Sequence, residues 1–171
     1  MAARRLLIAS ILLLLLNASA CEDRRADKAY LRGDYDKARR DIEFLAYGGE
    51  ARAQYDLGVM YDQGQGVEQS DIKAKEWYER AAQQGEPRAQ YNLGLMYLNG
   101  QGVPADVVKA YYWISLSANR GNTRARDAKY YVSEKMSAEQ IGSAKRLIQA
   151  YEEQAAQYKA CVFCNPANPS Y

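Results

Sequence analysis

A unit of 36 residues occurs twice in this chain, and this repetition constrains the fold more than any other sequence feature. The segment 49–84 aligns without gaps with 85–120, and 18 of the 36 positions are identical. The longest shared pattern, Arg-Ala-Gln-Tyr-x-Leu-Gly-x-Met-Tyr, stands at 52–61 and again at 88–97. Repetition at a fixed period of about 20 to 50 residues is typical of arrays in which each unit packs against its neighbours.

Each unit is predicted to form two helices. The apolar residues of the first helix fall at i, i+4 and i+8 on one face: Ala53, Leu57 and Tyr61. Those of the second helix fall at i, i+3 and i+7: Ala74, Trp77 and Ala81. Gly64 and Gly100 are predicted left-handed C-caps of the first helices, and Ser70 and Asp106 predicted N-caps of the second. Because neither helix can bury its apolar face alone, we expect stacked helical hairpins.

Gly58 and Gly94 stand at the same place inside the first helix of each unit. A glycine in a helix interior costs about 1 kcal/mol relative to alanine. Its recurrence therefore predicts that another part of the backbone approaches closely at both positions.

The repeat resembles the Sel-one-like repeat, a 36-residue relative of the tetratricopeptide repeat. That family's motif runs Ala-x-x-x-Leu-Gly-x-x-Tyr, then Gly-x-Gly-Val, then Asp, Lys-Ala, Trp and a double alanine before glycine. The first copy matches it at Ala53, Leu57, Gly58, Tyr61, Gly64, Gly66, Val67, Lys73, Ala74, Trp77, Ala81, Ala82 and Gly85. The second copy matches it at Ala89, Leu93, Gly94, Tyr97, Gly100, Gly102, Val103, Asp106, Lys109, Ala110, Trp113, Ala118 and Gly121. Ser70 replaces the motif's Asp in the first copy, and Ser117 replaces its first alanine in the second.

The resemblance implies an all-α fold, a right-handed α/α superhelical solenoid of tetratricopeptide-like helical hairpins. Residues 26–48 resemble an N-terminal hairpin cap, and residues 121–160 a degenerate C-terminal cap, so we expect about eight helices. Within the second cap, Ser137 and Gln140 form a predicted capping box that opens the last helix. Residues 161–171 are predicted to form a loose tail.

The N-terminus has the layout of a secretory signal in residues 1–20, with Arg4 and Arg5 before an apolar run. That run is far shorter than the roughly 20 residues that span a bilayer. The sequence Ala-Ser-Ala-Cys ending at Cys21 resembles a bacterial lipobox, which implies lipid attachment at Cys21 and a short linker over 21–25. Glu22 at the following position favours the outer membrane by resemblance to enteric lipoproteins. The alternative is cleavage at the Ala-x-Ala site, which releases a soluble periplasmic or secreted protein.

The chain has three cysteines, and lipid on Cys21 leaves Cys161 and Cys164 to pair with each other. A local disulfide is the favoured interpretation. A redox-active pair and half of a zinc site are the alternatives, although zinc needs two more ligands and the chain has no histidine.

The absence of histidine also excludes Ser-His and Cys-His catalysis. Without Arg4 and Arg5 the chain carries 21 Lys+Arg against 21 Asp+Glu, so counterion release offers little and nucleic acid is not an expected partner. We expect no metal and no small-molecule cofactor.

Fifteen tyrosines are the remaining compositional feature. Tyrosine gives a large contact area at low entropic cost, which favours recognition surfaces. Four tyrosines outside the repeat pattern are predicted to line a partner-binding groove, or else to fill the degenerate end of the array: Tyr111, Tyr112, Tyr130 and Tyr131.

By resemblance, periplasmic members of the family act as adaptors in envelope assembly or host interaction, or bind cell-wall enzymes. We therefore expect a lipid-anchored, non-enzymatic scaffold that holds a protein or peptide partner in the bacterial envelope. The alternatives are a cell-wall or β-lactam hydrolase and a thiol-disulfide protein acting through Cys161 and Cys164.

Overall fold

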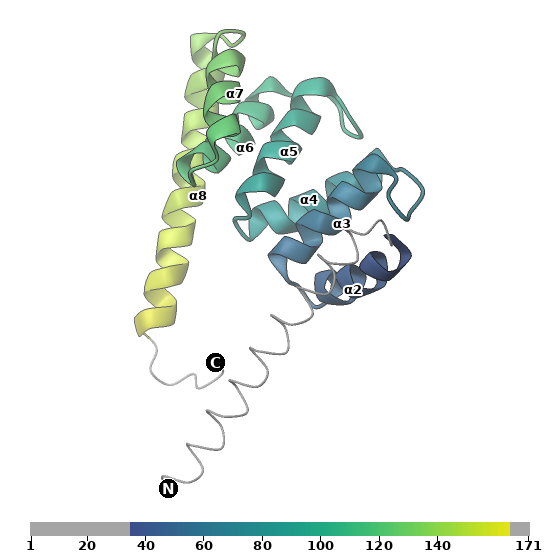
Figure 1. The fold of residues 1–171 in the computed structure, drawn as a ribbon. Helices are drawn as coiled ribbons and strands as arrows, with labels where there is room; N and C mark the ends of the chain where they lie inside the picture. Colours follow the sequence, from purple (N-terminus) through teal and green to yellow (C-terminus); the bar gives the residue numbers. More distant parts are fainter. Residues whose placement is uncertain (1–34, 165–171) are drawn as a thin grey trace, which may run out of the picture. The chain divides into compact units, whose positions relative to one another are not determined.

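The computed structural model describes the backbone of residues 35–164 and the side chains of residues 37–157. This part of the chain is helical throughout, and no strand occurs in it (Figure 1). The helices are α2 (Tyr35–Tyr47), α3 (Ala51–Gln63), α4 (Asp71–Gln83), α5 (Pro87–Asn99), α6 (Val107–Asn119), α7 (Thr123–Ser133) and α8 (Ala138–Cys164). The predicted all-α class is confirmed. The first helix expected for the N-terminal hairpin lies outside the described residues.

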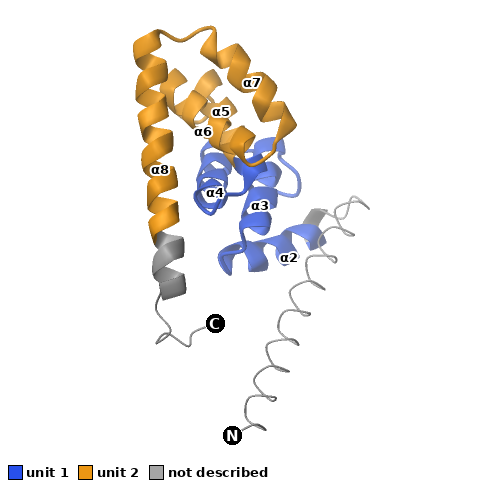
Figure 2. Cartoon of the chain, turned by 90° about the vertical axis from the view of Figure 1, so that its left-hand side faces the viewer, with its two compact units in different colours: residues 1–89 blue, residues 90–171 orange. Residues whose placement is uncertain are grey.

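The chain divides into two compact units, residues 1–89 and 90–171 (Figure 2). Helices α2, α3 and α4 belong to the first unit, α6, α7 and α8 to the second, and α5 crosses the boundary.

The first unit is built on the hairpin of α3 and α4, with α2 packed against α3. Its core joins residues from all three helices: Ala38, Ile42, Leu45, Ala46, Ala53, Leu57, Met60 and Trp77. The predicted apolar faces of the first repeat are therefore the faces that this unit buries.

The second unit packs α6 against both α7 and α8. Its core is formed by Tyr111, Ile114, Ala125, Val132, Met136 and Ala144. Helix α8 runs to Cys164, so the backbone of 161–164 is helical where the sequence predicted the start of a loose tail.

The predicted N-cap and C-cap residues of the helices are confirmed. Ser70 Oγ accepts a hydrogen bond from the Lys73 backbone N–H at 3.4 Å, and Asp106 Oδ1 accepts one from that of Lys109 at 3.0 Å. Gly64 and Gly100 take left-handed φ angles of 68° and 72°. The capping box closes in both directions: the Ser137 N–H donates to Gln140 Oε1 at 2.8 Å, and the Gln140 N–H donates to Ser137 Oγ at 3.2 Å.

Gly58 and Gly94 lie where each hairpin closes. A Cβ on Gly58 would stand 2.6 Å from the Tyr78 ring of α4. A Cβ on Gly94 would stand 2.6 Å from Ile114 Cγ1 and 3.1 Å from the Ala110 carbonyl oxygen of α6. The predicted backbone approach is thus observed at Gly94, whereas at Gly58 the close neighbour is an aromatic ring.

This difference predicts unequal costs for the two alanine substitutions. Gly94→Ala pushes against backbone that cannot move alone, so we expect a loss of about 2–4 kcal/mol in the free energy of unfolding. Gly58→Ala meets the buried Tyr78 side chain but no backbone of α4, so we expect a smaller loss of about 1–2 kcal/mol. Urea denaturation monitored by circular dichroism measures both.

Gly142 in α8 supplies the matched control, because a Cβ there would have only Arg146 Nη1 near it, at 3.8 Å. Gly142→Ala should stabilise the protein by about 0.5–1 kcal/mol through helix propensity. Equal destabilisation by all three substitutions would contradict the close-approach explanation.

Candidate functional site

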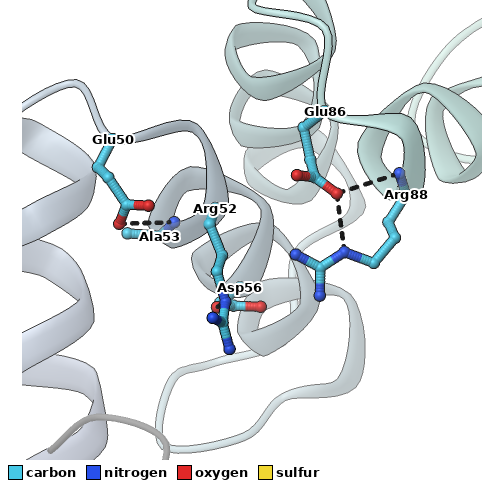
Figure 3. Close-up of polar contacts among 6 residues, drawn as sticks. All are labelled: Glu50, Arg52, Ala53, Asp56, Glu86 and Arg88. Carbon is cyan, nitrogen blue, oxygen red and sulfur yellow. Dashed lines mark hydrogen bonds and ion pairs between the residues drawn. The ribbon is translucent and has the colours of Figure 1, made fainter. Parts of the chain in front are cut away.

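Charged side chains gather at the start of the first helix of each repeat (Figure 3). Glu50 caps α3 by accepting from the Ala53 backbone N–H at 3.3 Å. Glu86, at the same place in the next repeat, instead accepts from the backbone N–H of Arg88 at 3.3 Å and from its Nε at 2.7 Å. Neither contact was predicted from the sequence, although both glutamates stand directly before a helix.

Arg88 also packs on the preceding repeat, with its guanidinium carbon 4.3 Å from the centre of the Tyr55 ring. Burial alone would lower the pKa of Arg88, but the hydrogen bond to Glu86 and the charges of Glu86 and Asp56 together raise it above its usual value. Arg52 pairs with the same Asp56 across 3.8 Å. Arg88 thus links the second repeat to Tyr55 and Asp56 of the first. Both arginines, Arg52 and Arg88, already pair with carboxylates.

A network of amide hydrogen bonds joins the two helices of the first repeat to each other and to α2. Gln84 Nε2 donates to Gln54 Oε1 at 2.8 Å and to the Gly49 carbonyl at 3.0 Å. Gln54 Nε2 in turn donates to the Ala46 carbonyl at 3.2 Å. Since buried polar groups are costly unless hydrogen-bonded, the buried Gln54 side chain fixes the ends of α2 and α4 against α3.

The second unit contains an aromatic cluster between α6 and α8. The Tyr112 ring meets that of Trp113 edge-on at 4.8 Å and that of Tyr151 at 6.3 Å between centroids. The Arg120 guanidinium lies 5.7 Å from the Tyr151 ring centre. Burial and the neighbouring Tyr151 raise the pKa of Tyr112 to about 12, while Arg120 opposes the shift.

The structure separates the four tyrosines predicted to bind a partner. Tyr111 is 6% exposed and lies in the core, and half-buried Tyr112 packs toward α8. Tyr130 and Tyr131 are 68% and 51% exposed on α7. Lys135 Nζ lies 4.2 Å above the Tyr131 ring. Tyr130 and Tyr131 are thus the two whose rings are open to a partner.

Tyr130 stands 36 residues after Gly94 and 72 after Gly58. The face of α7 that corresponds to the hairpin-closing face of α3 and α5 therefore carries a large ring. The same face has Arg126 where the repeats have the buried Gln54 and Gln90, and Arg126 is exposed. Where the repeats close on their second helix, α7 presents an exposed face of tyrosine and arginine.

The cysteine predictions fall outside the described side chains. Cys21 lies outside the described residues, and of Cys161 and Cys164 only the helical backbone is described. Lipid attachment and the disulfide stay predictions.

Metal binding and membrane spanning find no support within the described residues. No cluster of three or more Cys, Asp or Glu side chains there could hold a metal ion. No helix in the same range combines the length and the hydropathy needed to cross a bilayer.

Comparison with known proteins identifies the repeat. The Sel1 repeat family profile matches residues 51–86 and 87–122. These two units have the same 36-residue length as the aligned segments 49–84 and 85–120, and each begins two residues later. A Sel1 repeat protein from Oxalobacter formigenes is 38% identical, with a TM-score of 0.59 over 70% of this chain and 96% of that protein.

A protective antigen of uropathogenic Escherichia coli strains, which displays an SLR fold, is 28% identical with a TM-score of 0.75. The match covers 90% of this chain, which spans only 34% of the antigen. No curated protein matches the sequence.

The raised pKa of Tyr112 predicts a loss of stability at alkaline pH. An unfolded tyrosine ionises near pH 10, whereas folded Tyr112 holds its proton to about pH 12. Its contribution is therefore fully present below about pH 10 and is lost as the pH rises toward 12. Tyr112→Phe should reduce the fall in Tm between about pH 9 and pH 11.5, measured by circular dichroism.

Tyr130→Phe removes the same hydroxyl from an exposed ring and should leave the wild-type pH profile unchanged. Identical alkaline profiles for wild type and Tyr112→Phe would contradict the predicted shift.

Proposed function

Because the chain belongs to the Sel1 repeat family, whose helical repeats generally serve as non-catalytic scaffolds for protein partners, we propose that it is an interaction scaffold of the bacterial cell envelope. The signal-like segment before Cys21 supports the envelope location, and the resemblance of residues 18–21 to a lipobox supports anchoring at Cys21 facing the periplasm. The partner is a protein or peptide.

The exposed face of α7 is the observation that carries this proposal. Tyr130 and Tyr131 present two aromatic rings, and Arg124 and Arg126 are exposed on the same helix. Tyrosine and arginine are enriched at the energetic centres of protein interfaces.

A hydrolase and a thiol-disulfide protein remain the competing functions, each with a direct assay. Nitrocefin turnover tests the first, and insulin reduction tests the second. Both activities are expected to be absent.

Affinity capture from detergent-solubilised envelopes tests the binding role. The double variant Tyr130→Ser/Tyr131→Ser should lose a partner that the wild-type protein retains, with about a hundredfold loss of affinity if both rings are central to the interface. Ile72→Ser, which removes an exposed apolar side chain from α4, should retain it. Equal capture by all three proteins would refute the assignment to α7.

Intact mass spectrometry, after thiol alkylation without reductant, tests both cysteine predictions. The wild-type protein should carry acyl mass on Cys21 and no alkyl group on Cys161 or Cys164. Cys21→Ala should lose the acyl mass. A wild-type protein without acyl mass rejects the anchor, and two alkylated C-terminal thiols reject the disulfide.

A further inference from the structure

An arginine recurs near the start of the first helix of both repeats and of the degenerate unit that follows them. The three copies stand 36 residues apart: Arg52 on α3, Arg88 on α5 and Arg124 on α7. Arg52 pairs with Asp56 across 3.8 Å, and Arg88 pairs with Glu86 across 2.7 Å. The first two copies therefore show what an arginine at this position binds.

The third copy has lost both carboxylates that act on the second. The charges of Glu86 and Asp56 raise the pKa of Arg88. At the corresponding positions 36 residues later stand two neutral amides, Asn122 in place of Glu86 and Asn92 in place of Asp56. Asn122 still caps α7, but it brings no negative charge to the arginine that follows.

The Arg124 side chain is exposed, and no ion pair or ring contact holds it in the part of the chain that the structure describes. Asp127 lies one turn further along α7 and likewise forms no ion pair with a described residue. The helix has three basic residues and this one acidic residue, and the charges of Glu134 and Lys135, which follow it, cancel. Positive charge is therefore in excess on α7, and that of Arg124 is unused.

The second copy also shows the geometry that a carboxylate adopts at this position (Figure 3). Glu86 Oε1 accepts from the Arg88 backbone N–H at 3.3 Å and from its Nε at 2.7 Å. The Arg124 backbone N–H lies in the first turn of α7, where the helix itself offers no carbonyl to accept it. Arg124 thus offers a carboxylate the same two kinds of donor, on an exposed part of the helix.

We propose that Arg124 binds a side-chain carboxylate of the protein partner, in the place that Glu86 takes beside Arg88. The inference rests on the scaffold role proposed above and narrows the partner to a protein that presents an acidic segment to α7. Charge-assisted hydrogen bonds from arginine to carboxylate are short and directional, so this contact fixes how the segment lies. The exposed rings of Tyr130 and Tyr131 on the same helix add contact area.

A partner rich in phosphate is the competing occupant, because phosphate also pairs with arginine. Two observations favour the carboxylate. Both paired copies of the arginine hold a carboxylate. The chain without Arg4 and Arg5 has equal numbers of acidic and basic residues, so it has no overall attraction for a polyanion.

Fluorescence anisotropy with a defined probe tests the site. The probe is a short fluorescein-labelled peptide of alternating glutamate and alanine, added to residues 21–171 with Cys21→Ser so that no lipid is attached. The comparison probes are the same peptide with glutamine for glutamate and a thymidine oligonucleotide of equal length. We expect binding of the glutamate peptide alone, weakening between about 50 mM and 500 mM salt as charge screening increases.

Arg124→Gln should weaken binding of the glutamate peptide by about fivefold or more, as expected for the loss of a partly exposed charge-assisted pair. Asn122→Glu should weaken it equally, because it restores the internal carboxylate that Glu86 supplies to the second copy. Adding Arg124→Gln to Asn122→Glu should then cause no further loss.

The matched control is Arg146→Gln, which makes the same change in net charge at an exposed residue of α8. It should bind the glutamate peptide as the wild type does. Circular dichroism checks that every variant folds.

Four results would overturn the carboxylate site: no binding of the glutamate peptide, equal binding of the glutamine peptide, equal losses in Arg124→Gln and Arg146→Gln, or unchanged binding by Asn122→Glu. Equally tight binding of the oligonucleotide would assign the arginine to phosphate instead. Capture of an envelope protein that Tyr130→Ser/Tyr131→Ser abolishes, without peptide binding, would reject this site and keep the scaffold role.

Discussion

The close approach of paired helices at a single glycine position governs this protein's architecture. At Gly94 the backbone of the second helix of the repeat comes within 3.1 Å of where a Cβ would stand, and at Gly58 a tyrosine ring comes within 2.6 Å. Only a residue without a side chain allows this packing, which brings the apolar faces of both helices into contact. Once each hairpin is closed in this way, the caps fix where its helices begin and end.

The same constraint explains why the end of the array is different. Tyr130 occupies the position of the two glycines, so α7 cannot receive a second helix at that distance. Helix α8 packs against α6, and the Tyr130 ring remains open to solvent. The residue that ends the regular packing is therefore also the residue that gives α7 an exposed aromatic surface.

Much of the hairpin architecture could be predicted from the sequence, because each of its features occurs in both copies of the repeat. The period, the helix caps and the glycine positions each appear in both copies, so the hairpins could be predicted directly. The burial of Tyr111 and the exposure of Tyr130 could not be predicted, because spacing along a helix identifies a face but not the neighbour that covers it. Aligning residues 121–135 with the repeats would have placed Tyr130 on the glycine position, although the motif is lost there. The link from Glu86 and Arg88 to Tyr55 joins residues more than 30 positions apart, and a local pattern does not show which side chain a guanidinium meets.

Because the chain carries no net charge after the signal-like segment, the positions of its exposed cations matter for recognition. With equal numbers of acidic and basic residues after the signal-like segment, long-range attraction contributes little, and recognition has to come from local arrangement. Arg52 and Arg88 each stand within ion-pair distance of a carboxylate, so their charge is used inside the repeat junction. Arg124 and Arg126 of α7 instead share their helix with the exposed rings of Tyr130 and Tyr131. Tyrosine and arginine together are enriched at the centres of protein interfaces, which is why we place the partner-binding surface of this scaffold on α7 rather than on its repeats.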